Sequence, residues 1–246
     1  MTAELPFIVA LCPTFNHPEL LANSMALWEM QDYPAERRFL YILDDGNAFY
    51  SHGGDSWTLF GQAWRSNSLP EKYNHLAWHG ANRLPPAPDA FLVWEDDDLY
   101  LPGYVSAHAR VLAEHEYSKP ARVLSDYPGY LVEEPAAGRF HSTLGFRRSL
   151  FDRVGGWPLT KRADFDQQFI RALESNAASL GDPFADRKIE FVYRWHTGAH
   201  HGQSFMRSPD DQDWYDRAAA DRPAYIGRLE PRLDARTREL LAELGR

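Results

Sequence analysis

The stretch that decides the fold of this chain reads Ala90-Phe91-Leu92-Val93-Trp94-Glu95-Asp96-Asp97-Asp98-Leu99-Tyr100-Leu101-Pro102. An apolar run that stops at acids predicts a buried strand delivering carboxylates to the edge of a sheet. Four adjacent carboxylates repel one another, and their oxygen atoms suit hard divalent cations such as Mg2+ and Mn2+. The alternative is a solvated acidic loop, so the surrounding sequence has to decide between the two.

Two earlier segments have the same design. The apolar run at residues 5–11 leads into Pro13-Thr14-Phe15-Asn16-His17, and the run at residues 39–43 leads into Asp44-Asp45-Gly46-Asn47. Pro18 suits the first turn of a helix that we expect to reach about Gln31. Strand, loop, helix and strand in this order predict a parallel sheet, whose strands end at one edge where ligands of α/β proteins bind.

The rest of the chain predicts further α and β segments. Strands are expected at 57–64, 122–124, 129–132, 139–146 and 189–193, and helices at 71–83, 103–116, 147–154, 164–174 and 233–244. The last helix is amphipathic with mixed charge, which favours packing on its own chain over a membrane or a partner. No internal repeat or clean linker divides the sequence, so we predict one α/β domain.

Composition limits the classes of function. The 246 residues carry a formal net charge of -9, which argues against nucleic acid as a partner because its binding needs clustered Lys and Arg. A single cysteine, Cys12, allows no intramolecular disulfide and suggests a reducing compartment. No apolar stretch approaches the ~20 residues of a membrane helix, so we expect a cytoplasmic protein without a transmembrane segment.

Over residues 5 to about 205, the order and spacing of these motifs resemble the family 2 glycosyltransferases of GT-A fold. The loop at 13–16 looks like the family's Pro-Thr-Tyr-Asn, the turn at 44–47 like its Asp-Asp-Gly-Ser, and the acids with Pro102 like its Asp-x-Asp-Asp-x-x-x-Pro. The resemblance implies a mostly parallel central sheet flanked by helices. It also implies a nucleotide-sugar half (1–118), an acceptor half (119–205) and a C-terminal extension (206–246) within a single catalytic domain.

The resemblance also assigns residues to the donor. It implies that the first loop lines the pocket for base and ribose, that the second turn accepts a hydrogen bond from the base through Asp45, and that a helix start lies near ribose and diphosphate. The residues concerned are Pro13, Thr14, Asn16, Asp44, Asp45, Lys72 and Asn74, with Glu95 and Asp96 near the donor. Ordinary turn, cap or surface chemistry is the alternative for each of them.

For the metal, the resemblance implies Asp97 as the ligand that bridges to the diphosphate, with Asp98 beside it. Glu95 replaces the family's first aspartate, and its extra methylene moves that carboxylate outward. A late loop holds His196, His200 and His201, and an imidazole there could join the metal, with His200 and His201 preferred. Arg194 and Arg207 are further candidates for the diphosphate.

An acceptor hydroxyl needs a base, and the family places one at the start of a helix in the second half. Here that place holds Asp164 and Asp166, with Asp164 as the first choice and Asp166 as the second. Either could instead be an acid at a helix N-terminus.

The sequence therefore predicts a divalent-metal enzyme that moves a sugar from a nucleotide-sugar, with UDP-sugars expected, to an unidentified acceptor with inversion. A weak oligomer is left open. A non-catalytic nucleotide-sugar or carbohydrate-binding module, a sugar nucleotidyltransferase and a metal-dependent hydrolase are the alternatives. The loop at 11–17 has neither the glycine nor the basic residues that a nucleotidyltransferase usually carries there.

Overall fold

The computed structural model describes residues 5–83, 86–195 and 224–246, and its centre is a parallel βαβ unit. Strand β1 (Ile8–Thr14) leads through helix α1 (Pro18–Glu29) to strand β2 (Arg38–Asp44), preceded by the short 3-10 helix η1 (Ala35–Arg37). The two strands pair in parallel over their whole length, from Ile8 with Arg38 to Thr14 with Asp44. Both loops predicted to bind a ligand therefore leave the sheet at the same edge.

Within the described residues, this unit belongs to an eight-stranded sheet with the order β11-β7-β10-β5-β1-β2-β4-β3. Its other members are β3 (His52–Gly53), β4 (Trp57–Gly61), β5 (Ala90–Val93), β7 (Tyr117–Ser118), β10 (Gly145–Arg147) and β11 (Leu180–Gly181). Strands β5, β1, β2 and β4 run parallel, whereas β10 pairs antiparallel with both β5 and β7. The predicted mostly parallel sheet is thus confirmed.

A smaller sheet stands next to the edge where β5 ends. It has the order β6-β12-β8-β9, formed by β6 (Leu99–Tyr100), β12 (Phe191–Arg194), β8 (Arg122–Tyr127) and β9 (Tyr130–Pro135). Since β5 ends at Val93 and β6 begins directly after Asp98, Trp94 and the four acids connect one sheet to the other. This position holds their backbone at both ends.

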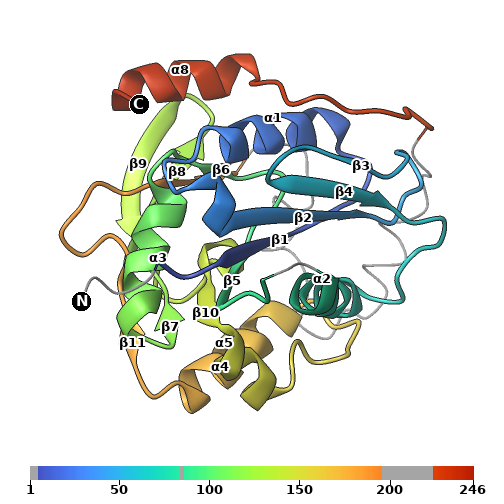
Figure 1. Cartoon of the computed structure of the whole chain (residues 1–246). Coiled ribbons are helices and arrows are strands. Elements are labelled where there is room, and N and C mark those ends of the chain that lie inside the picture. The colour runs from blue at the N-terminus through green and yellow to red at the C-terminus, as the bar shows by residue number, and fades with distance from the viewer. Residues whose placement is uncertain (1–4, 84–85, 196–223) are drawn as a thin grey trace.

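Helices cover both faces of the large sheet (Figure 1). Helix α1 and the C-terminal α8 (Ala235–Leu244) lie on one side, while α2 (Leu69–Arg83), α4 (Arg148–Val154) and α5 (Phe165–Asn176) lie on the other. Helix α3 (Tyr104–Glu114) and the short η2 (His141–Thr143) complete the described elements. Alternate residues of β1 point into two separate hydrophobic cores, one on each face, which explains its unbroken apolar sequence.

Two sequence predictions need correction. Strand β1 does not end before Pro13 but continues to Thr14. Proline is tolerated there because β5 ends opposite Leu11, so no strand on that side needs a hydrogen bond from the N–H that Pro13 lacks. The segment 139–146, predicted as one β-like stretch, instead contains η2 followed by the start of β10. Phe140 and Leu144 are buried in the core although neither belongs to a strand.

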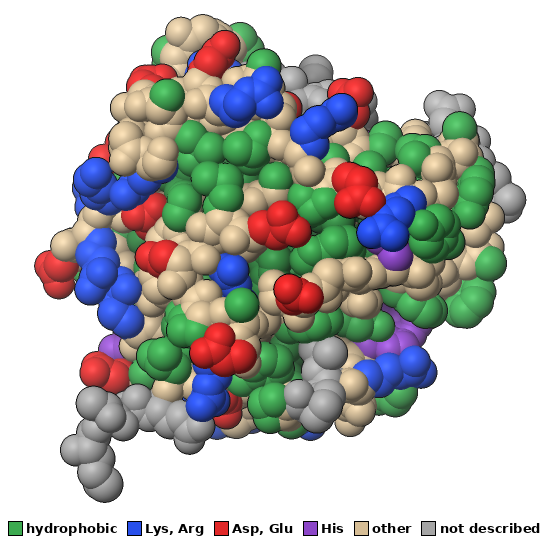
Figure 2. All heavy atoms as spheres, turned by 45° about the horizontal axis from the view of Figure 1, so that its top comes forward, with side chains coloured by type: hydrophobic (Ala, Val, Ile, Leu, Met, Phe, Trp, Pro, Cys, Tyr) green, Lys and Arg blue, Asp and Glu red, His purple; other side chains and the backbone are tan. Residues whose placement is uncertain are grey.

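The C-terminal helix packs on its own chain, as predicted. Leu240 and Leu241 of α8 are buried in the core that also holds α1, and Arg236 binds the fully buried Asp126 of β8. Among the described residues, no helix is both long and apolar enough to cross a membrane. On the face shown in Figure 2, basic and acidic side chains alternate and form no continuous basic surface.

Candidate donor and metal site

The site is built where β1, β2 and β5 end together. The backbone N–H of Trp94 donates to the carbonyl of Leu11, which carries the β1–β5 pairing to the start of the acidic run. Beyond the paired residues the side chains also meet, since the Thr14 hydroxyl donates to Asp96 at 2.5 Å. His17, on the same loop, lies 3.5 Å from the same carboxylate oxygen. Asp96 therefore ties the first loop to the acidic run.

Three carboxylates of the acidic run converge into a candidate metal centre. One oxygen atom from each of Glu95, Asp97 and Asp98 lies within 4.8 Å of the others. Asp97 and Asp98 are buried, and Glu95 is partly exposed. Asp98 also accepts the backbone N–H of Arg194 at 3.1 Å, which fixes it against β12. Carboxylates gathered this closely are costly unless a cation neutralises them, and the donor set suits Mg2+ or Mn2+.

Asp45 and Lys72 form a buried ion pair that joins β2 to α2. The Lys72 ammonium donates to Asp45 at 2.6 Å and to the Thr14 carbonyl at 2.5 Å, while Arg65 contacts the same carboxylate at 2.5 Å. Burial alone raises the pKa of Asp45, but Lys72 and Arg65 outweigh it and hold that pKa below its ordinary value. Lys72 is 1% exposed, and from this buried position it joins the end of β1 to the turn after β2.

The neighbouring Asp44 shapes the turn itself. Its carboxylate is fully buried and accepts the backbone N–H groups of Gly46 and Ala48 at 2.8 Å each. Burial raises its pKa, and these hydrogen bonds offset that only in part. Asn16 and Asn47 have positive φ angles of 59° and 58°, a conformation that Asn tolerates in tight turns. Of the first loop, Thr14 is buried and Asn16 is exposed at the sheet edge.

A second hydrogen-bond network, formed by Tyr73, His141 and Trp157, holds Glu95. The Trp157 indole N–H donates to His141 Nε2 at 2.9 Å, so Nε2 is unprotonated and His141 Nδ1 carries the hydrogen that reaches Glu95 Oε1 at 3.0 Å. The Tyr73 hydroxyl donates to the same oxygen at 3.0 Å. Two donors thus fix one oxygen of the longer side chain that replaces the expected aspartate.

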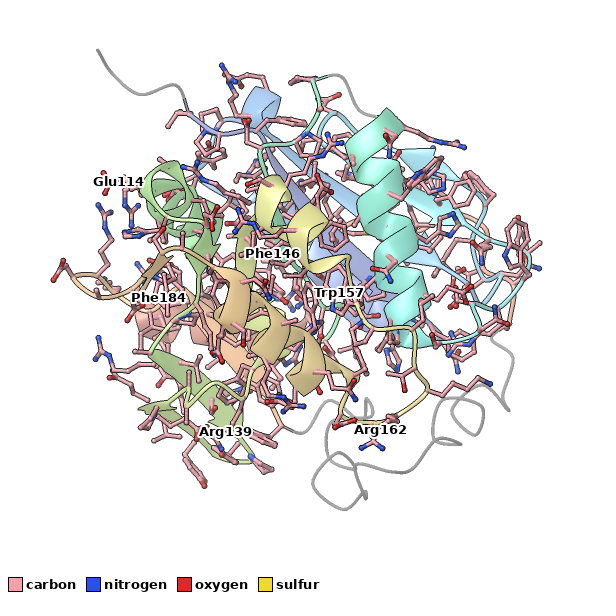
Figure 3. All side chains as sticks on the ribbon, turned by 90° about the horizontal axis from the view of Figure 1, so that it is seen from below. Glu114, Arg139, Phe146, Trp157, Arg162 and Phe184 are labelled. Carbon is pink, nitrogen blue, oxygen red and sulfur yellow. The ribbon has the colours of Figure 1, made fainter. Side chains whose placement is uncertain are left out.

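Asn74 is part of the support for this network. Its side-chain amide makes two hydrogen bonds of 2.8 Å with the backbone N–H and carbonyl of Trp157, joining α2 to the turn after α4. Gly156, at φ 81°, leaves no room for a side chain, because an added Cβ would lie 2.4 Å from the Asn74 oxygen. Figure 3 shows Trp157 between α2 and α5.

The two candidate bases have different surroundings. Asp164 precedes α5 and accepts hydrogen bonds from Arg162 at 3.0 Å and Gln168 at 2.8 Å, and the bond from Arg162 lowers its pKa. Asp166, in the first turn of α5, has its pKa raised mainly by burial, and the charges of His141 and Glu95 also act on it. Asp166 therefore lies within electrostatic reach of the acidic run, with the pKa direction that suits a base near neutral pH.

Other predicted residues lie elsewhere. His196, His200, His201 and Arg207 fall outside the described residues. Arg194 is buried and pairs with Asp234 at 3.0 Å, so it holds the C-terminal segment to β12. Sequence reasoning missed His141, Tyr73 and Arg65, which have no motif of their own. They are identified only by their contacts in the folded chain, with Glu95 for His141 and Tyr73 and with Asp45 for Arg65. His141 also comes from a segment that was predicted as a strand.

This arrangement is the GT-A fold, and comparisons with solved structures agree. No protein-family model and no curated protein sequence matches the chain. S. aureus TarS 1-349 in complex with UDP-GlcNAc matches with a TM-score of 0.62 and 17% identity over 87% of this chain and 65% of that one. The mannosyltransferase PcManGT from Pyrobaculum calidifontis, in complex with GDP-Man and Mn2+, gives 0.58 and 17% over 80% and 59%. The chain thus spans less than two thirds of each neighbour, and at these identities the likeness establishes the fold.

Proposed function

We propose that this protein is a metal-dependent glycosyltransferase that moves a sugar from a nucleotide-sugar to an acceptor hydroxyl with inversion. The observation that carries the proposal is the convergence of Glu95, Asp97 and Asp98 where the GT-A sheet ends. A divalent ion held there would neutralise the charge that develops on the departing nucleoside diphosphate. The complexes of structural neighbours with UDP-GlcNAc and with GDP-Man and Mn2+ support a donor of this class.

The residues take the following roles in this proposal. Asp97 and Asp98 hold the ion, Glu95 faces the donor sugar, and Thr14 with Asn16 borders the nucleoside. Asp45 already accepts hydrogen bonds from Arg65 and Lys72. A nucleobase that approaches Asp45 therefore also meets Arg65, whose guanidinium lies 3.7 Å from the centre of the Phe15 ring. Lys72 and Asp44 are buried and do not contact the donor in this proposal; they hold the backbone of the two loops that border it. His200 and His201 remain predicted further ligands.

The acceptor side is assigned to Asp166. Its raised pKa and its place near His141 and Glu95 favour it over Asp164, the first choice from sequence. Asp166 would take the proton of the acceptor hydroxyl as that oxygen bonds to the anomeric carbon and the bond from this carbon to the nucleoside diphosphate breaks, which makes a single inverting displacement.

The test is nucleoside diphosphate release from a panel of UDP- and GDP-sugars, with and without Mn2+, with water or simple sugars as acceptors. We expect Asp97→Asn to lower turnover by roughly 100-fold, because it removes charge stabilisation at the leaving group. Asp152→Asn is the matched control, since that side chain on α4 is 63% exposed and lies 3.7 Å from Arg148. Metal-dependent donor binding without turnover would favour the binding-module alternative. A protein that neither binds nor turns over any donor would overturn the proposal.

A further inference from the structure

A pair of histidines on α2 lies apart from the acidic run. His75 and His79 are four residues apart, one turn of helix, and their Nε2 atoms are 2.7 Å from each other. One ring must donate and the other accept, so the two Nε2 atoms already face each other. Two imidazoles presented in this way on one helix face are the arrangement that binds transition metals.

The surroundings fix one ring and leave the other adjustable. His79 is 6% exposed, and its ring stacks against both Tyr41 and Phe60, with centroids 5.8 Å and 6.0 Å away. Its Nδ1 is buried and makes no hydrogen bond with the residues described here, so Nε2 is the nitrogen that can serve a ligand. His75 is only partly buried and can rotate.

Both rings hold the neutral form that metals require. Burial lowers the pKa of His75, and burial together with His75 and Arg83 lowers the pKa of His79 to about 4. At neutral pH, a metal that binds the two Nε2 atoms has to displace only the one proton that they share in their hydrogen bond. Glu71, one turn before His75, is the nearby acid that counters the charge of an added cation.

We propose that His75 and His79 form a two-histidine chelate site for a transition ion of the Zn2+, Ni2+ or Cu2+ class. Imidazole nitrogen favours these ions, whereas the carboxylates at the strand ends favour Mg2+ or Mn2+, so the two sites select different metals. Two bonds of about 2.0–2.1 Å at a tetrahedral angle place the nitrogens about 3.3 Å apart. The present 2.7 Å therefore has to widen by about 0.6 Å, which a small rotation of His75 supplies. Water completes the coordination.

The site would act on the helix that supports the candidate donor pocket. Lys72 and Tyr73 precede His75 by less than one turn and hold Asp45 and Glu95. An ion bound to the folded helix and not to the unfolded chain stabilises this element by mass action.

Trp78 provides a reporter for the test. Its side chain is 55% exposed, and its ring centroid lies 5.0 Å from that of His79. Cu2+ is paramagnetic and quenches an adjacent indole, so titration with Cu2+ should quench part of the tryptophan emission in a saturable way. Calorimetry with Zn2+ measures the same site without relying on fluorescence. The background for both is the triple variant His196→Gln, His200→Gln and His201→Gln, which removes these three histidines as competing ligands.

In that background, His75→Gln and His79→Gln should each weaken binding by about tenfold or more, because one imidazole remains and the chelate is lost. His52→Gln, on β3, is the matched control and should bind unchanged. Trp78→Phe should keep the calorimetric binding and lose the quenching. Far-UV circular dichroism checks that each variant is folded. No saturable binding in the background protein, or binding by His75→Gln equal to that of the background, would overturn the proposal.

Discussion

Asp164 and Asp166 are two residues apart, yet their surroundings move their pKa values in opposite directions. Hydrogen bonds from Arg162 and Gln168 keep Asp164 ionised, while burial raises the pKa of Asp166. We expect Asp166→Asn to lower kcat by roughly 100-fold or more and Asp164→Asn by less than about tenfold. Donor affinity should change little in either variant.

The same assignment has a pH dependence. Asp166 must be ionised to accept a proton, so kcat should fall as pH decreases through its raised pKa. The measurement is kcat against pH with saturating donor and Mn2+. A larger loss for Asp164→Asn than for Asp166→Asn would return the base to the residue preferred from sequence.

His141 is expected to act through Glu95 rather than on substrate. Its Nδ1–H reaches Glu95 because Trp157 occupies Nε2. His141→Leu removes the donor and should lower kcat by about 10- to 100-fold, the usual cost of losing a group that orients a ligand. His141→Asn places an amide N–H near the position of Nδ1 and should recover part of that loss. Equal activity in both variants would mean that His141 fills space and does not orient Glu95.

At the scale of elements, Lys72 connects strand β2, the end of β1 and helix α2 from a buried position. Removing Lys72 takes away one of the cations that compensate the buried Asp45 carboxylate, while Arg65 still contacts it. We expect Lys72→Met to lower the free energy of unfolding by about 3 kcal/mol, measured by urea denaturation. Lys188→Met, at an exposed position, is the control and should change it by less than about 0.5 kcal/mol. A double variant with Asp45→Asn should lose less than the sum of both single changes.

The elements also show which features could be predicted from sequence. The strand ends at 44 and 93 were predicted to within one residue because continuous apolar runs stop at polar residues there, whereas the first strand continues past its apolar run to Thr14. The parallel order followed from the alternation of strands with helices. Lys72 was expected at the diphosphate because a motif gives position along a helix but not the direction of the side chain. His141 and Arg65 could not be found, since each meets its partner through contacts between segments 46 and 20 residues apart.

At the scale of the whole molecule, the C-terminal segment connects the smaller sheet to α1. Arg236 donates to both oxygens of the buried Asp126 on β8, at 2.6 Å and 3.2 Å, and the Asp234 backbone N–H binds Asn23 of α1. Arg236→Met should lower the free energy of unfolding by about 2 kcal/mol, because hydrogen bonds to charged groups contribute about 1.5–3 kcal/mol. Arg238→Met, exposed on the same helix, should have little effect. Similar losses in both variants would mean that the ion pair adds nothing to the packing of α8.

The buried His108 predicts how stability of the whole fold depends on pH. It lies in α3 against Tyr104 and Phe184, fully buried, and neither ring nitrogen makes a hydrogen bond within the described chain. Burial, with a smaller contribution from Arg110, lowers its pKa to about 3. The unfolded chain therefore binds this proton near pH 6.5 while the folded chain does not, so stability is complete above that pH and decreases toward pH 3. The loss amounts to about 1.4 kcal/mol per pH unit over this range.

His108→Leu removes the titrating group and leaves an apolar side chain of similar volume in the same core. Its urea midpoint should thus depend less on pH between about 6 and 4 than that of the original protein, and should equal or exceed it at pH 7, because a buried ring without hydrogen bonds is costly. His79, whose pKa is lowered to about 4, keeps some acid sensitivity of the same sign in both proteins. Parallel pH profiles for the two proteins would show that the pKa of His108 does not differ between the folded and the unfolded chain. The acid sensitivity would then arise elsewhere.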